Sequence, residues 1–242
     1  MIRKPMIAAG SALALVLAGS AHADPWKGKG EAGLVFARGN SDSDTVNLKL
    51  AMSKEVDRWK HSLDMSYLRA SNSGVESSNR FVGGWQSDYK LSEKTFAFGA
   101  LHYEQDKYSG FDYQASASTG MGYKFYDTDK IKLSAQAGVG YRQIKDNLTD
   151  QTSNDVIFVA GMDYENAITD TTKIIDKAHL ESGSDNTLLT NFIGVEVKMS
   201  DKLALAAGLD WRHNSKPPTD PVTGVQKKSD DTVTTLNLVY AF

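Results

Sequence analysis

Cysteine is absent from all 242 residues. Its absence excludes a disulfide framework, a thiol nucleophile and a zinc site built on cysteine. Long apolar runs are also missing after the first 23 residues, so the chain is not a helical membrane protein, which needs about 18 or more consecutive apolar residues per span. No linker rich in Pro, Gly or Ser divides the remainder, which favours one domain rather than two.

The first 23 residues have the layout of a secretory leader. Arg3 and Lys4 form its basic start, an apolar run follows, and a small-residue cleavage site ends at Ala23. We therefore expect a signal peptide at 1–23 and one mature domain at 24–242. Cleavage changes the formal net charge from −3 to −5, because the leader holds two basic residues and no acidic one. A mildly acidic mature chain argues against nucleic acid as a partner.

The mature chain contains a succession of segments in which apolar and polar residues alternate. In the segment 112–125, tyrosine, alanine, methionine and phenylalanine at odd positions oppose glutamine, serine, glycine and lysine at even positions. A period of two is the pattern of a strand with one apolar and one wet face. Most segments span about 9–13 residues, which suits a tilted transmembrane strand, whereas soluble strands average five or six. Twelve strands are predicted, at 26–38, 45–53, 59–69, 79–90, 95–105, 112–125, 131–142, 155–165, 172–181, 189–199, 203–212 and 232–242.

Two of these segments are ambiguous. The segment 95–105 is apolar on both faces, so its inward face is not defined. The segment 172–181 leaves a charge on the apolar face in either phase. We expect a β-bulge near Asp176 to resolve that conflict.

The connections favour a barrel over a sandwich. Every second link is a short turn, and most of the alternate links are longer and polar: 39–44, 71–78, 106–111, 145–154, 182–185 and 214–231. Both chain ends then lie on the short-turn side. This layout predicts an all-β, antiparallel, up-and-down transmembrane β-barrel of about 12 strands, with short periplasmic turns and longer extracellular loops.

The last strand is predicted to be the closing strand of the barrel and to be paired to its last residue, since its alternation continues to Phe242. Its even positions become steadily more apolar and aromatic toward Tyr240 and Phe242, while Thr235 and Asn237 lie on the other face. Such an ending resembles the C-terminal assembly signal of bacterial outer-membrane barrels, which implies outer-membrane lipid and the barrel-assembly machinery as partners. An edge strand of a soluble β-protein is the alternative for this stretch.

A short motif near the mature N-terminus carries a family resemblance. From Gly33 to Thr45 the sequence has the form G-x-x-x-x-x-G-N-S-x-x-x-T, with Trp26 before it and Trp59 after the next strand. This pattern resembles the family called domain of unknown function 481, whose members are often described as salt-induced outer-membrane proteins. The likeness covers the whole mature chain. It implies an outer-membrane barrel and carries over no catalytic or ligand-binding residue.

The predicted inward face mixes charges of both signs. Eight strands are filled by side chains and sixteen leave an aqueous channel, so twelve are expected to enclose a narrow lumen. We predict a narrow channel for a small solute or ion. The alternative is a non-conducting barrel with a structural or surface-interaction role in envelope stress or salt adaptation, its lumen filled by salt bridges and water. The lumen-lining candidates are the constriction residues Arg80, Arg142 and Arg212, together with Asp163, Glu165 and Asp210.

An outer-membrane hydrolase is the remaining class, and we expect no enzyme. His213 lies near Asp210 in sequence at the outer rim, but the spacing does not match omptin-like proteases. His61 falls on the lipid side, near the girdle of aromatic residues expected at the inner membrane interface, which suits an interface residue. The histidines of the mature chain are His61, His102, His179, close to Glu181, and His213.

No cofactor or metal site is predicted. Asp42 and Asp44 offer clustered oxygens of the kind that Ca²⁺ prefers. Their spacing matches no complete calcium loop. Gly39 and Asn40 are explained by a tight turn that needs positive φ.

Overall fold

The computed structural model describes residues 26–37, 43–147, 149–219 and 224–242. The expected leader, 1–23, lies outside these ranges. So do the turn predicted at Gly39 and Asn40, and Asp42 of the acidic pair. The described part of the chain holds no helix long and apolar enough to cross a membrane.

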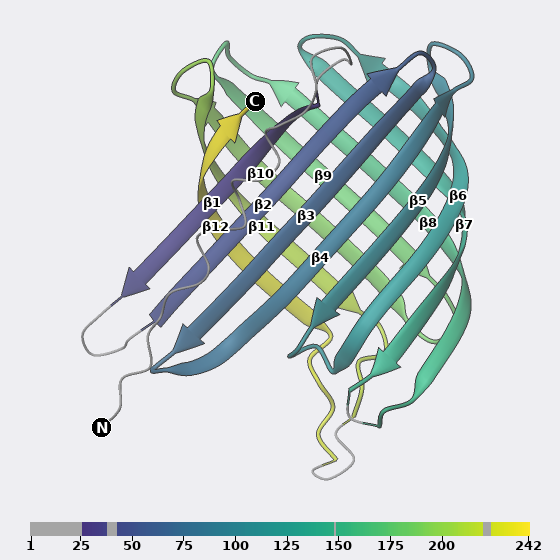
Figure 1. Ribbon diagram of the computed structural model, residues 1–242, viewed down its shortest axis with the longest axis vertical. Coiled ribbons are helices and arrows are strands. Elements are labelled where there is room, and N and C mark those ends of the chain that lie inside the picture. The colour runs from purple at the N-terminus through teal and green to yellow at the C-terminus, as the bar shows by residue number, and fades with distance from the viewer. Residues whose placement is uncertain (1–25, 38–42, 148, 220–223) are drawn as a thin grey trace.

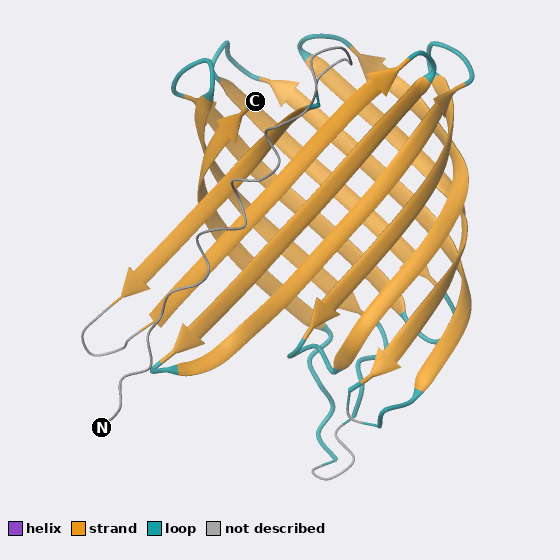
Figure 2. Ribbon diagram, viewed as in Figure 1, coloured by secondary structure: helices purple, strands orange, loops and turns teal. Residues whose placement is uncertain are grey.

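Twelve strands form one closed barrel, as Figures 1 and 2 show. Each strand pairs antiparallel with its neighbours in sequence, and β1 closes the ring by pairing with β12. The predicted all-β, up-and-down barrel of twelve strands is confirmed. The strands are β1 (Lys27–Ala37), β2 (Ser43–Val56), β3 (Trp59–Asn72), β4 (Val75–Lys90), β5 (Thr95–Asp106), β6 (Phe111–Asp127), β7 (Ile131–Asp146), β8 (Thr152–Ala167), β9 (Thr172–Ser182), β10 (Thr187–Lys198), β11 (Leu203–Asn214) and β12 (Asp230–Ala241).

The two ends of the barrel differ in one connection. The link between β11 and β12 covers residues 215–229, and it projects from the lower end of the barrel in Figure 1. We call this end the loop end. The opposite end, which carries the C-terminus and the short links that follow the even-numbered strands, is called the turn end.

Most other connections at the loop end are shorter than predicted. Much of the predicted loop 71–78 is strand, since β3 runs to Asn72 and β4 starts at Val75. Between them, Ser73 and Gly74 have φ of 50° and 78°, which suits a two-residue hairpin turn. Polar residues occupy both faces of the strands here, so the alternation fades from the sequence while backbone pairing continues. The strands consequently reach 11 to 17 residues.

Alternation places apolar side chains on the outside of the barrel. Leu34, Leu101, Val139 and Val156 are each more than half exposed, as a lipid-facing wall requires. The lumen, in contrast, contains many of the buried polar residues. These include Asn47, Glu104, Asp106, Gln114, Arg142, Asp155, Glu181, Arg212 and Asn237.

Aromatic residues gather on the outer wall near the turn end of β3 and β4. The rings of Trp59 and His61 stack at 6.0 Å, and Trp59 packs against Tyr89 at 5.0 Å. Trp26 meets Trp85 edge-on at 6.1 Å. This cluster corresponds to one predicted interface girdle. It also places His61 on the outer wall, as the sequence indicated.

The structure defines the phase of β5. Phe96 and Phe98 point into the barrel and pack against Ile157 and Val159 of β8. Because side chains alternate along the strand, the same inward face carries His102 and Glu104. The segment is apolar on both faces because its inward residues fill part of the lumen with an internal apolar cluster.

The bulge predicted near Asp176 is wrong. The pairing of β9 with β8 and with β10 proceeds without a register shift. Ile175 is buried on the lumen side, so Asp176 lies on the outer wall. There Asn191 donates to its carboxylate at 2.7 Å, and Tyr164 is its directly opposed partner on β8. A neighbouring amide therefore accommodates the charge without a break in the sheet.

The last strand is paired to the end of the chain. Gly28 and Phe242 exchange two backbone hydrogen bonds of 3.0 Å, each residue donating its N–H to the carbonyl of the other. Leu236, Leu238 and Tyr240 are exposed outside the barrel, whereas Asn237 is buried inside. The predicted role of this segment as the closing strand is confirmed.

Glycine allows two strands to approach closely beneath the apolar cluster. Gly120 of β6 and Gly138 of β7 face each other in register. A Cβ added to Gly138 would lie 2.1 Å from the carbonyl oxygen of Thr119, and one added to Gly120 would lie 2.8 Å from the Phe98 ring. The sheet has no room for a methyl group here, so the glycines are required for this packing.

Gly138→Ala is expected to destabilise the folded barrel by about 1–3 kcal/mol, because the clash involves backbone atoms that must shift. Urea unfolding of the refolded protein, followed by heat-modifiable gel migration, measures the effect. Gly99→Ala is the matched control, since a Cβ there has nothing within 4 Å, and it should change stability by less than about 0.5 kcal/mol. Equal losses in the two variants would contradict the packing argument.

Candidate functional site in the barrel lumen

The lumen contains two cavities that follow one another along the barrel. The central cavity has a volume of about 450 Å³, and the second, at the turn end, has a volume of about 440 Å³. Lys29 and Glu196 line both. Their side chains form an ion pair of 3.0 Å, and Lys173 contacts the same glutamate at 3.2 Å. This group of charges therefore marks the boundary between the two cavities.

An ion pair crosses the lumen near the loop end. Arg212 of β11 contacts Glu104 of β5, and these strands lie six positions apart in the ring of twelve. The two side chains are only 4% and 2% exposed. The pair therefore joins opposite walls of the barrel and narrows the passage between the central cavity and the loop end.

A second arginine also links strands that are not neighbours in the barrel. Arg80 of β4 contacts Asp106 at 2.5 Å and Asp231 of β12 at 3.2 Å. The contact to Asp231 links strands that are four positions apart in the ring. Arg80, Arg212 and their carboxylate partners form what we call the loop-end layer: Arg80, Glu104, Asp106, Arg212 and Asp231.

Arg142 is fully buried, but it braces the wall rather than crossing the lumen. Its guanidinium donates to the backbone carbonyl of Asn186, and it lies 3.6 Å from Asp155 and 3.8 Å from Glu181. Asn186 in turn donates to Asn214 at 2.8 Å. Arg142 thus ties β7, β8 and β9 to the connection that leads into β10 and to the base of the long loop.

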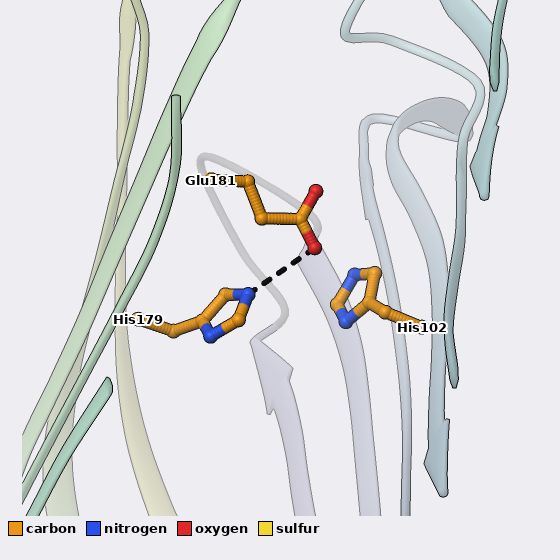
Figure 3. A group of neighbouring side chains, drawn as sticks. All are labelled: His102, His179 and Glu181. Atoms are coloured by element: carbon orange, nitrogen blue, oxygen red, sulfur yellow. Dashed lines mark hydrogen bonds and ion pairs between the residues drawn. The ribbon is translucent and has the colours of Figure 1, made fainter. Parts of the chain in front are cut away.

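Two histidines and a glutamate converge just inside this layer (Figure 3). His102 comes from β5 and His179 from β9, and their rings stack with centroids 5.8 Å apart. His179 Nε2 lies 3.3 Å from Glu181 Oε1. The hydroxyl of Ser116 donates to the same carboxylate oxygen at 2.7 Å. All four residues line the central cavity.

Several buried polar atoms in this region have no protein hydrogen-bond partner among the described residues. A dry and permanently sealed network pairs its polar atoms, because each unpaired one costs about 1–3 kcal/mol. Water is therefore the expected partner of these atoms. The unpaired atoms include His102 Nε2, Glu104 Oε1, Arg142 Nε, both Gln114 amide atoms, and Arg212 Nε and Nη2.

The six lumen candidates occupy different levels of the barrel. Arg80 and Arg212 belong to the loop-end layer, and Arg142 lies in the adjacent wall. The acidic candidates lie further from the loop end, each beside a lysine. Asp163 is 3.6 Å from Lys177, Glu165 is 3.6 Å from Lys173, and Asp210 is 3.7 Å from Lys49.

Sequence reasoning missed part of the site. Glu104, Asp106 and His102 lie on β5, whose phase the alternation left undefined. Placing the charged residues of that segment inside would have identified them. His213 is not paired with Asp210, its neighbour in sequence. Its Nδ1 contacts Asp230 of β12 at 2.9 Å instead, because the antiparallel register brings those two residues opposite each other.

A closed, twelve-stranded, up-and-down barrel with an apolar outside and a polar lumen has the architecture of outer-membrane β-barrels. The chain belongs to the family described as "Protein of unknown function, DUF481", whose model matches residues 30–242. It is 24% identical over 218 residues to the uncharacterized protein YdiY of Escherichia coli (strain K12), covering 90% of this chain and 83% of that protein.

Solved barrels align with this chain. The NanC porin aligns with a TM-score of 0.51 at 10% identity, covering 90% of this chain and 99% of that one. The KdgM porin aligns with a TM-score of 0.46 at 10% identity, covering 89% and 99%. At such low identity the likeness to NanC shows the fold alone.

Arg212→Ala is expected to destabilise the barrel by roughly 2 kcal/mol, because it leaves Glu104 buried without its partner. The double variant Arg212→Ala/Glu104→Ala should lose less than the sum of the two single losses. Urea unfolding of the refolded protein measures all three. Arg69→Ala is the matched control, since its side chain is 58% exposed. Strict additivity of the two lumen changes would show that the cross-lumen pair contributes nothing to stability.

Proposed function

We propose that this protein is a narrow outer-membrane channel for small solutes or ions, with the loop-end layer as its constriction. The observation that carries the proposal is the pair of cavities, about 450 and 440 Å³, which share the lining residues Lys29 and Glu196. Together they provide a path along the lumen from the turn end to the layer around Arg212.

The barrel's outer wall supports its placement in the outer membrane. Apolar side chains cover the outside, and aromatic residues gather near the turn end, where a lipid interface favours them. In such barrels the short turns face the periplasm, so the turn end is the periplasmic side of this proposal. Delivery to the membrane would use the predicted leader and recognition of Tyr240 and Phe242 by the barrel-assembly machinery.

The mixed charges suit a narrow passage. Lysine, arginine, aspartate and glutamate all contribute to the lumen surface, so neither anions nor cations meet a surface of one sign. Twelve strands lie between the filled eight-stranded barrels and the open sixteen-stranded porins. Small hydrated solutes or ions are therefore the expected cargo.

A non-conducting structural barrel is the second candidate. The contact between Arg212 and Glu104 across the lumen favours it, as does the apolar cluster around Phe98. The unpaired polar atoms of Arg212 favour the channel, because a hydrated layer can rearrange to admit a solute.

A hydrolase is disfavoured by the arrangement of the polar groups. In a serine hydrolase the hydroxyl is hydrogen-bonded to the imidazole that serves as its base. Ser116 instead donates to the carboxylate of Glu181. The hydroxyl is directed to the acid, so these three groups do not form a nucleophile with its base.

Planar-bilayer recording of the refolded mature protein tests the channel. We expect small discrete conductance steps from the wild-type protein. Arg212→Ala and Glu104→Ala should enlarge them, because each truncates one half of the contact that crosses the lumen. Arg69→Ala, which changes an arginine outside the lumen, should leave the step size unchanged. The wild-type and Arg212→Ala barrels could both be silent in the bilayer while heat-modifiable gel migration shows that both are folded. That result would contradict the channel and favour the structural role.

A further inference from the structure

The histidine pair in the lumen has a composition that neither a solute path nor a structural plug requires. His102, His179 and Glu181 each offer one ligand atom, and these atoms all lie within 4.8 Å of one another. Figure 3 shows the two imidazoles and the carboxylate directed toward a common point. The groups reach that point from two separate strands, β5 and β9.

We propose that His102, His179 and Glu181 form a binding site for a divalent transition-metal ion such as Zn²⁺. Two imidazoles and one carboxylate are a common donor set for such ions, with a further position left to water or another ligand. The inference concerns metal binding, and it stands whether or not the barrel conducts.

The distances suit an ion with short bonds. Ligand atoms about 2.1 Å from a tetrahedral ion lie roughly 3.4 Å from one another. His179 Nε2 and Glu181 Oε1 are already 3.3 Å apart. The imidazole of His102 must move inward to complete the set, and no hydrogen bond from the described residues holds its Nε2 in place.

The arginines leave the ligand oxygens available. Arg142 approaches Glu181 through Oε2, and Arg212 contacts Glu104 through Oε2. The Oε1 atom of Glu181 therefore faces the histidines. Among the described residues, Glu104 Oε1 has no hydrogen-bond partner, and the Oε2 atom of the same carboxylate lies 3.9 Å from His102 Nε2. A second carboxylate thus lies beside one of the proposed ligands.

Ser116 acts as a positioning residue for this site. Its hydroxyl donates to Glu181 Oε1 at 2.7 Å and so fixes the carboxylate opposite the imidazoles. Groups that orient a metal ligand in this way typically change metal affinity by about 10–100-fold when they are removed.

The donor set selects among cations. Imidazole nitrogen favours Zn²⁺, Cu²⁺ and Ni²⁺, whereas Mg²⁺ and Ca²⁺ prefer sites made of oxygen alone. The site also lines the central cavity, so an ion can reach it through the lumen. Once bound, the ion would join β5 to β9 and narrow the passage further.

Isothermal titration of the refolded mature protein in detergent with ZnCl₂ tests the site. We expect one Zn²⁺ per chain and no comparable binding of Mg²⁺ or Ca²⁺. His102→Gln/His179→Gln should lose this binding, and Ser116→Ala should weaken it by about tenfold or more, whereas Ser116→Thr, which keeps the hydroxyl, should restore it. His61→Gln/His213→Gln is the matched control and should bind as the wild-type protein does.

Three results would overturn the proposal. They are a folded wild-type barrel that binds no Zn²⁺, a folded His102→Gln/His179→Gln barrel that binds it unchanged, and loss of binding in the control variant alone. Should the double variant fail to fold, X-ray absorption spectroscopy at the zinc edge of the wild-type complex decides the question. Two imidazole nitrogens and a carboxylate oxygen at about 2.0–2.2 Å are expected, and a shell without two imidazoles contradicts the site.

Bilayer recording separates this proposal from the channel. If the barrel conducts, Zn²⁺ should reduce the current through the wild-type protein and leave His102→Gln/His179→Gln unaffected. Zinc binding in the calorimeter by a barrel that is silent in the bilayer would refute the channel and retain the metal site. Conduction by a barrel that binds no zinc would support the channel and refute the metal site.

Discussion

Hydrogen bonding of the backbone is the constraint on which this structure depends. Inside a bilayer no water is present to satisfy an open strand edge, so a sheet that crosses it must close on itself. The chain meets this requirement by pairing β1 with β12 and by extending that pairing to Phe242. Every other feature, from the alternating faces to the position of the lumen charges, follows from a ring in which each strand has two neighbours.

Closure also turns the inside of the sheet into an enclosed polar space. Charges buried in that space find partners on other strands, because an unpaired buried charge is costly. Near the loop end this pairing joins opposite walls through Arg212 and Glu104. Near the turn end, Lys29 and Lys173 both contact Glu196 at the boundary between the two cavities. The same need for partners brings two histidines and a glutamate together beside Ser116.

The sequence predicted the barrel because lipid imposes a regular pattern on the strands. Clear alternation in 112–125 defined β6, and the apolar side of the last strand indicated the closing partner of β1. The prediction failed where the pattern had another origin. The segment 95–105 is apolar on both faces because Phe96 and Phe98 fill the lumen. Asp176 remains on the outer wall because Asn191 donates to it. The residues 71–78 pair beyond the apolar band, where alternation is no longer required.

The amino-acid sequence by itself therefore determined the class of fold, the number of strands and the mixed charge of the lumen lining, since each depends on local period and composition. It could nominate Arg80, Arg142 and Arg212, but it could not say which of them crosses the lumen. That depends on which strands face each other in the closed ring, a relation between residues more than 100 positions apart, such as Glu104 and Arg212. The convergence of His102 with His179 was likewise decided only by tertiary structure, because the curvature of the sheet brings β5 toward β9.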